Sequence, residues 1–414
     1  MHTQPPSEPT ANPTAEPATR QCDYDIAIIG AGMVGATLAH AVARLGLRTL
    51  VIEHHPLVEN SDHPGYDDRA IALAWGSRQI LESLALWPQL AAEASPIRQI
   101  HVSEQGRFGI TRLHSRDYGV EALGYVVTGQ QLGRVLLGGI TTLPGVTLAA
   151  PAKLIDLQQH PRHVALTINE ENGITQRTTR LLVAADGARS LVRQRLGIGA
   201  REWDYHQSAI ITTLTSTQPR PALAFERFSE EGPLALLPLL AGRYAAVWSV
   251  AEERREQVMA LDDGAFAQQL SACFGTRLGT LRVSAPRRCY PLRLVHADRL
   301  GQGRALLIGN AAHALHPITG QGFNLGLRDV AALADLLQQA QRQGSELGGE
   351  SMVAAYSAAR LADQRLLTLV TDGLIRLFTN PLPPLRLGRS LGLTLLDNSP
   401  RLKGALARRF MGLG

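Results

Sequence analysis

The sequence has little of what marks several common protein classes. Its three cysteines, Cys22, Cys273 and Cys289, form neither a CxxC metal pair nor a plausible disulfide framework, which fits a reducing cytosol. No window reaches about 18 uncharged apolar residues, so no membrane-spanning helix is expected. We find no internal repeat, no metal-ligating cluster, and no run of Lys or Arg of the kind that binds nucleic acid.

The bulk composition describes a globular protein with somewhat little charge. Of the 414 residues 45% are hydrophobic and 19% charged, and the net charge is +5. This length suggests two or three domains or one large composite one. The positive surplus fits attraction to an anionic cofactor or to lipid headgroups. Residues 1–22 are rich in Pro, Thr, Ala and Glu without an apolar core, so we expect a disordered leader and a cytoplasmic protein.

A glycine-rich motif follows the first apolar segment. Asp25–Ile29 suits a buried parallel strand, and Gly30, Gly32 and Gly35 follow it as GxGxxG before the helical stretch Thr37–Leu45. The first glycine permits a tight turn, the second lets a pyrophosphate approach the backbone, and the third lets the helix pack on the strand. The start of that helix would present free N–H groups to phosphates.

An acidic residue completes this unit. Arg48–Ile52 is a second apolar strand that ends at Glu53, where a carboxylate can accept hydrogen bonds from a ribose. The whole pattern is typical of dinucleotide-binding folds and does not separate NAD from FAD. A glycine-rich turn that binds nothing is the alternative.

Two later strands end in similar motifs. The apolar strand Leu181–Ala185 runs into Asp186 and Gly187, and the strand Ala305–Ile308 runs into Gly309 and Asn310. After the second strand come a loop containing Pro317, Gly320 and Gly322 and a helix through Leu337.

With these three motifs in order, the sequence resembles the aromatic flavoprotein monooxygenases of the para-hydroxybenzoate hydroxylase type, from about Asp25 to Asp363. The segment "HPITGQGFNLGLRD" looks like the signature of the ubiquinone-biosynthesis hydroxylases. "GYDDRAIALAWGS" and "AFERFSEEGPLALLPL" are similar to the branch that acts on polyprenylated methoxyphenols. The resemblance implies FAD as the cofactor.

The resemblance also assigns roles to individual residues. It implies that the GxGxxG glycines hold the FAD pyrophosphate, Glu53 the adenosine ribose, and Asp186 the pyrophosphate together with NAD(P)H use. Arg69 would reach back to FAD near the mobile flavin, and Gln130 lies near a polar FAD contact whose register is open by one residue. The full set is Gly30, Gly32, Met33, Gly35, Glu53, Arg69, Gln130, Asp186, Gly187, Asn310, Pro317, Gly320, Gln321, Gly322, Phe323 and Asn324.

Asn310 departs from the superfamily pattern, which has Asp at the residue that binds the flavin ribityl chain. Asn keeps an acceptor oxygen of similar shape and adds a donor without charge. FAD binding should therefore survive. The branch that acts on polyprenylated methoxyphenols shares this Asn, so the change supports that resemblance.

Several of these residues also have ordinary structural interpretations. Asp186 could be a helix N-cap, and Arg69 could be a solvated surface residue. A lone histidine is more often structural than catalytic, which applies to His313 and His316. No catalytic residue is identified; His316 and Pro317, beside the expected flavin ring, are weak candidates for substrate contact.

The expected fold is an α/β composite: a Rossmann-like FAD-binding fold with an inserted antiparallel substrate-binding sheet and C-terminal helices. The sheet is predicted from alternating or β-branched runs such as "SAIITTLTST", "LAFERF" and "RYAAVWSV". One helix is predicted over 253–275. The predicted domains are 1–22 (leader), 23–97 with 123–202 and 293–345 (FAD-binding), 98–122 with 203–292 (sheet), and 346–414 (helical).

The implied reaction is aromatic hydroxylation. NAD(P)H reduces FAD, O₂ adds to the reduced flavin, and a flavin C4a-hydroperoxide delivers one oxygen to a polyprenylated phenol. A second GxGxxG after a strand is missing, so NAD(P)H would bind transiently or electrons would come from another protein. A related flavin oxidoreductase, such as a halogenase or prenyl reductase, another hydroxylase of the pathway, and a non-catalytic FAD-bound subunit of a ubiquinone-synthesis complex remain alternatives. Contact with other proteins of that pathway and with the inner face of the membrane is left open.

Overall fold

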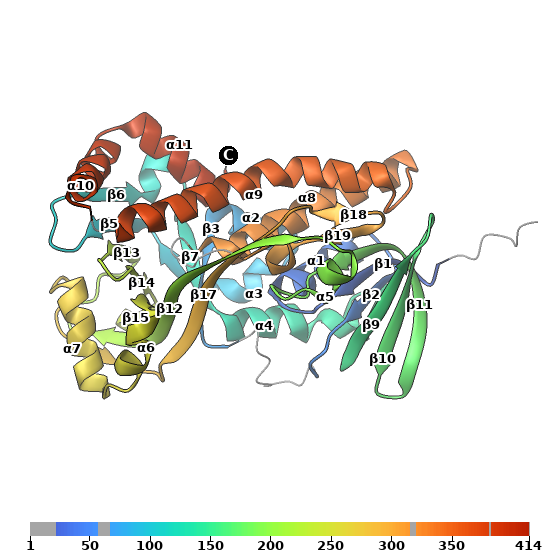
Figure 1. The fold of residues 1–414 in the computed structure, drawn as a ribbon, viewed down its shortest axis with the longest axis horizontal. Helices are drawn as coiled ribbons and strands as arrows, with labels where there is room; N and C mark the ends of the chain where they lie inside the picture. Colours follow the sequence, from blue (N-terminus) through green and yellow to red (C-terminus); the bar gives the residue numbers. More distant parts are fainter. Residues whose placement is uncertain (1–21, 57–66, 315–319, 381, 414) are drawn as a thin grey trace, which may run out of the picture.

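The computed structural model describes residues 22–56, 67–314, 320–380 and 382–413. Its first sheet has a parallel core in the order β19–β11–β1–β2–β8, at the right of Figure 1. Three further strands extend this sheet by antiparallel pairing: β18 on β19, and a β9–β10 hairpin on β11. The strands are β1 (Tyr24–Ile29), β2 (Thr49–Ile52), β8 (Val146–Ala149), β9 (Ala152–Gln159), β10 (Val164–Glu170), β11 (Gly173–Ala184), β18 (Gly301–Gln302) and β19 (Ala305–Leu307).

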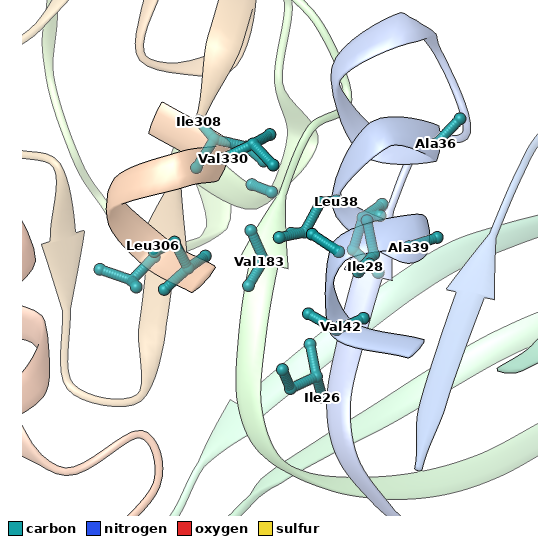
Figure 2. Close-up of a cluster of buried hydrophobic side chains, with 14 of the residues drawn as sticks. Ile26, Ile28, Ala36, Leu38, Ala39, Val42, Val183, Leu306, Ile308 and Val330 are labelled. Atoms are coloured by element: carbon teal, nitrogen blue, oxygen red, sulfur yellow. The ribbon is translucent and has the colours of Figure 1, made fainter. Parts of the chain in front are cut away.

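The parallel strands form because their apolar runs are buried on both faces. Figure 2 shows Val183 of β11 between Leu306 of β19 and Leu38, which lies on the helix that follows β1. That helix is α1 (Met33–Ala43), and nine of its eleven residues are buried. The four strands and the helices predicted around the three glycine motifs are present. Two ends differ most: β11 begins at Gly173, eight residues before the predicted start, and α8 continues to Gln343, six residues past the predicted end.

A second sheet lies at the other end of the molecule, beneath α10 and beside α6 and α7 in Figure 1. It is antiparallel except for one pair, since β5 runs parallel to β13. The predicted sheet was wholly antiparallel; this pair differs because its two strands come from separate insertions. The strands are β5 (Gln99–Glu104), β6 (Ile110–His114), β12 (Ala200–Ser216), β13 (Leu223–Phe228), β14 (Pro233–Pro238), β15 (Arg243–Ala251), β16 (Leu281–Val283), β17 (Arg288–Ala297) and β20 (His313–Ala314).

A three-stranded sheet and short helices connect these two parts. The strand order is β3–β7–β4, and β3 leads directly into α2. The bounds are β3 (Ala70–Ala74), β4 (Ser95–Ile97), β7 (Gly124–Thr128), α2 (Trp75–Ser83), α3 (Trp87–Ala91), α4 (Gly129–Gly138) and α5 (Leu191–Arg195), with 3₁₀ turns η1 (Ser115–Tyr118), η2 (Ile140–Thr142), η3 (Leu240–Gly242) and η4 (Gly309–Ala311).

The remaining helices agree with the sequence-based expectation in all but one place. The helix predicted over 253–275 is two helices, because Asp262 caps a new helix by accepting a hydrogen bond from Ala265 N–H. The predicted break at "NPLPPL" separates α9 from α10. None of the helices within the described ranges is long and apolar enough to cross a bilayer. The bounds are α6 (Glu252–Met259), α7 (Asp263–Phe274), α8 (Gln321–Gln343), α9 (Glu350–Thr379), α10 (Pro383–Asp397) and α11 (Pro400–Met411).

Candidate cofactor and active site

Four of the predicted cofactor segments lie at one edge of the first sheet. Gly30 follows β1, Glu53 follows β2, Asp186 follows β11, and Asn310 follows β19. These strands are parallel neighbours, so their carboxyl ends meet at the same edge, where ligands bind in open α/β sheets. The structure therefore brings together segments that are up to 280 residues apart in the chain.

The three glycines of the first motif differ in what surrounds them. Gly30 has φ +98°, and a Cβ there would lie 2.6 Å from the carbonyl oxygen of Ala185. A Cβ on Gly35 would lie 1.9 Å from the carbonyl oxygen of Gly30. Gly32 is the N-cap of α1, and a Cβ there would meet no described atom within 4 Å. Gly30 and Gly35 are thus required by close backbone contacts, and Gly32 leaves space in front of a helix start that no described side chain caps.

Glu53 is buried and holds the glycine loop. Its Oε2 accepts a hydrogen bond of 2.7 Å from Ala31 N–H, and its Oε1 accepts one of 2.9 Å from His55 N–H. The side chain is only 5% exposed. Contact with the adenosine ribose stays a prediction, and it is compatible with the place of Glu53 at the carboxyl end of β2.

Asp186 has one buried oxygen in use and one without a partner. Its Oδ2 accepts a hydrogen bond from Val192 N–H at 3.2 Å, while no described residue bonds to its buried Oδ1. Burial raises the pKa of this carboxyl, against hydrogen bonds from Ser190 and Val192 that lower it. The N-cap of α5 is Ser190, which accepts from Arg193 N–H. Asp186 is therefore not the N-cap of α5, although its Oδ2 accepts a hydrogen bond from the first turn of that helix.

The loop that carries Asn310 is held in place by hydrogen bonds to Asp329 of α8. Asp329 is fully buried and accepts hydrogen bonds from Gly309 N–H at 3.0 Å and from the Nε of Arg360 at 2.7 Å. His313 Nε2 lies 2.6 Å from the same carboxylate, which agrees with the structural interpretation of this histidine. Asn310 itself is exposed, so its side chain is accessible to a ligand.

The start of α8 carries five predicted contacts. Gly320, with φ +59°, is the N-cap, and a Cβ on Gly322 would meet no described atom within 4 Å. Asn324 is buried and fully engaged: its oxygen accepts from Ala74 N–H, and its amide donates to the carbonyls of Ala72 and Gly320. Its side chain therefore joins α8 to β3, and a cofactor contact would have to come from the helix start itself.

The other predicted contacts near the two helix starts are less exposed. Met33 and Phe323 are half-buried against the core, and Gln321 is buried and donates to the carbonyl of Phe410.

Arg69 and Gln130 come together at the start of β3. The carbonyl of Arg69 accepts from Gly129 N–H, and Gln130 N–H donates to the carbonyl of Asp67. The Arg69 guanidinium donates to Asp67 at 2.7 Å and lies 4.8 Å from the ring centre of Tyr290. Arg69 is thus a member of a cluster rather than a solvated surface residue, and the exposed side chain of Gln130 is accessible.

Sequence reasoning missed two carboxylates in this region. Asp67 accepts a hydrogen bond of 2.6 Å from the Tyr290 hydroxyl of the second sheet, and Asp329 anchors the Asn310 loop. The second could have been found, because Asp329 is an acid on the same helix face as the buried Leu325 and Leu333. His316 and Pro317, the weak candidates for substrate contact, lie outside the described residues.

The surroundings fit FAD. Open space lies over the backbone at Gly32, Gly187 and Gly322, as a diphosphate and a flavin ring need for close approach. The helices α1 and α8 both begin at glycines without a side-chain cap from the described residues, and such helix starts favour anionic groups. The unpaired Oδ1 of Asp186 lies at the same edge of the sheet.

Comparison with known proteins agrees with this geometry. The family model described as FAD binding domain matches residues 23–368. The chain is 37% identical to Ubiquinone hydroxylase UbiL of Rhodospirillum rubrum over 96% of this chain and 92% of that protein. It is 33% identical to 3-demethoxyubiquinol 3-hydroxylase of Escherichia coli, over 94% of this chain and 98% of that protein.

A solved structure shares the fold. The p-nitrophenol 4-monooxygenase PnpA of Pseudomonas putida DLL-E4 superposes with a TM-score of 0.76 at 18% identity, covering 94% of this chain and 98% of that one. The chain belongs to the FAD-binding-domain family, and it is an FAD-dependent monooxygenase. FAD is its cofactor, and NAD(P)H is the co-substrate typical of the family.

Proposed function

We propose that the protein is an aromatic-ring hydroxylase of ubiquinone biosynthesis that converts 2-polyprenyl-6-methoxyphenol to 2-polyprenyl-6-methoxy-1,4-benzoquinol. The observation that carries this proposal is the segment Gly309–Asp329, in which Asn310 replaces the usual Asp of the flavin loop. Relatives named ubiquinone hydroxylase and 3-demethoxyubiquinol 3-hydroxylase, which align over almost the whole chain, support the pathway.

FAD would supply the hydride acceptor and the activated oxygen, and the chain would bind and orient the reactants. Gly32 and the start of α1 would hold the pyrophosphate, and Asn310 the ribityl chain. The start of α8 at Gly322 would direct N–H groups at the electron-rich edge of the ring, where negative charge develops on reduction. Excluding water from this region would protect oxygen transfer from wasteful decay.

Deletion of the gene followed by lipid extraction tests the proposal. We expect 2-polyprenyl-6-methoxyphenol to accumulate and ubiquinone to fall. Accumulation of a different precursor would assign another hydroxylation step of the pathway, and normal ubiquinone would contradict the proposal. Complementation with a variant that folds and binds FAD without turnover would separate an enzyme from a non-catalytic subunit. The variant would restore ubiquinone only if the protein acts as a non-catalytic subunit.

We propose further that the C-terminal helices rest on an anionic lipid surface, where a polyprenylated substrate would be found. Large exposed hydrophobic side chains are concentrated there, and only four lie in the rest of the described chain. Residues 382–414 contain six basic residues and one acidic, a net charge of +5 that equals the charge of the whole chain. We call the nine exposed leucines of this region the leucine face: Leu366, Leu369, Leu377, Leu382, Leu385, Leu387, Leu391, Leu395 and Leu402.

Replacing Leu387, Leu391 and Leu395 together by serine should weaken vesicle binding by about tenfold or more, because each leucine contributes of the order of 1 kcal/mol when half-buried. Flotation with vesicles of phosphatidylglycerol and phosphatidylcholine measures the change. We expect weaker binding to phosphatidylcholine alone and at high salt. Ile174→Ser, at an exposed position of the first sheet, is the control. Unchanged flotation of the triple variant would contradict membrane contact through these leucines. If light scattering showed that the wild type is a dimer and the triple variant a monomer, a second copy of the chain would cover this face instead.

A further inference from the structure

Glu226, in the middle of the second sheet, has a buried carboxyl oxygen that lacks a hydrogen-bond partner among the described residues. It lies on β13, which has β14 on one side and β5 on the other, so Glu226 pairs across with Ala235 and Val102. Its Oε1 is buried, and no described residue forms a hydrogen bond to that oxygen. An orphaned carboxyl inside a protein costs folding free energy, and a bound group that donates a hydrogen bond to it would remove that cost.

Strand alternation shows which face of the sheet Glu226 occupies. Phe225 packs against Phe274 of α7, on the outer face of the sheet. Glu226 therefore points to the opposite face, together with Ala224 and Phe228. Phe228 stacks on Phe378 of α9, with ring centroids 3.7 Å apart.

The inner face packs against β3, which in turn contacts the start of α8. Ala224 belongs to one buried cluster with Ala70 and Ala72 of β3. Ala72 in turn touches the start of α8: a Cβ on Gly320 would lie 3.2 Å from its Cβ. Glu226 is thus two residues along β13 from Ala224, the side chain that packs against β3 beside the start of α8.

The side chains that pair directly with Glu226 are apolar and not fully packed, while the buried ion pair of Glu104 with Arg389 lies further along the same face. Val102 and Ala235 lie directly beside it on the two neighbouring strands, and Val247 of β15 pairs with Ala235 one strand further on. Val102, Val247 and Glu226 itself each keep some accessible surface, although the carboxyl lies so deep that burial raises its pKa well above the usual range. An aromatic ring would pack against such a face, and one hydroxyl could satisfy the carboxyl.

We propose that Glu226 binds the phenol hydroxyl of the substrate, which donates a hydrogen bond to Oε1 and so fixes which ring carbon faces the flavin. The inference rests on the proposed function. It makes Glu226 a specificity-determining residue: a site built around a hydrogen bond to a hydroxyl rejects the analogue that lacks it.

The test uses the FAD-loaded protein and two probes, 2-allyl-6-methoxyphenol and its methyl ether. Binding is followed by the change in flavin absorbance, without turnover. The wild type should prefer the phenol by about tenfold or more, and Glu226→Leu should abolish that preference. Glu226→Gln keeps an acceptor oxygen and should retain most of it. Glu256→Leu, at an exposed carboxylate of α6 in the same domain, is the matched control.

Thermal unfolding of the ligand-free protein provides a second readout. Removing an unpaired buried carboxyl should raise the melting temperature of Glu226→Leu by about 2 °C or more, whereas loss of a structural residue would lower it. Glu226→Met is the second variant if leucine does not pack. A lower melting temperature with an unchanged hydroxyl preference would overturn the inference. Failure of the wild type to bind the phenol would instead overturn the proposed function.

Discussion

Replacing Asp329 by alanine is expected to cost about 3–5 kcal/mol of folding free energy and to yield protein without bound FAD. Asp329 is fully buried and compensates the charge of Arg360, which is itself buried. The variant would leave that guanidinium with Asp363 as its remaining carboxylate. It would also leave Gly309 N–H without its acceptor, which frees the loop that carries Asn310.

Urea unfolding and the flavin absorbance of purified protein measure these two losses. Asp335→Ala, at an exposed position of the same helix, should change stability by less than about 0.5 kcal/mol. A variant at Asp329 that keeps full FAD content would contradict the anchoring role.

The pH dependence of the Asp329 variant follows from the sign of its pKa shift. Burial alone would raise the pKa of Asp329, but His313 and Arg360 hold it below its usual range. A carboxyl with a depressed folded-state pKa stabilises the protein above its unfolded-state pKa and loses this contribution as pH falls through the folded-state value. The stability gap between wild type and variant should therefore be constant near neutral pH and close only in acid.

Two neighbouring glycine substitutions should separate folding from cofactor binding. Gly35→Ala places a Cβ 1.9 Å from the Gly30 carbonyl oxygen, so α1 must move away from β1 and we expect a loss of about 3 kcal/mol or more. Gly32→Ala meets no described atom within 4 Å. It should fold as well as the wild type yet bind FAD at least about tenfold more weakly, because the methyl group occupies the space of the pyrophosphate.

Thermal unfolding without cofactor and FAD titration by flavin fluorescence give the two quantities. Gly138→Ala, in the last turn of α4, also has open space around it and should leave FAD affinity unchanged. If Gly32→Ala binds FAD normally, the pyrophosphate does not lie over this glycine. If Gly35→Ala is fully stable, the close approach of α1 to Gly30 is not required.

The parts of the fold that follow local rules were predictable from the sequence. The strands that lead to Gly30, Glu53, Asp186 and Asn310 end in apolar runs followed by turn residues, and all four end where expected; β11 begins earlier than predicted because its first half is polar. The split at Asp262 was missed although Asp is a common N-cap, because apolar spacing continues through it. The parallel pairing of β5 with β13 could not be predicted, since it depends on where two insertions meet in space.

The same reasoning explains what was missing from the site. Asn324 was expected at the flavin because of its motif, and nothing local reveals that Ala72 and Ala74 consume its hydrogen-bonding groups. Successive side chains of β13 point to opposite faces of the sheet, and both faces carry apolar residues. Sequence alone does not say which face meets α7 and which meets β3, so the surroundings of Glu226 could not be predicted. Hydrogen-bond partners that are distant in the chain can be identified only from the three-dimensional structure.

The strand order of the first sheet has a consequence for synthesis of the chain. β1 lies between β2 and β11, and Ile29 pairs with Ala184, 155 residues later. At translation rates of about 5–20 residues per second, one edge of this apolar strand waits roughly 8–30 s on the ribosome for its neighbour. We expect the nascent chain to need chaperone protection during that interval, and FAD to bind only after β19 has added Asn310 to the site.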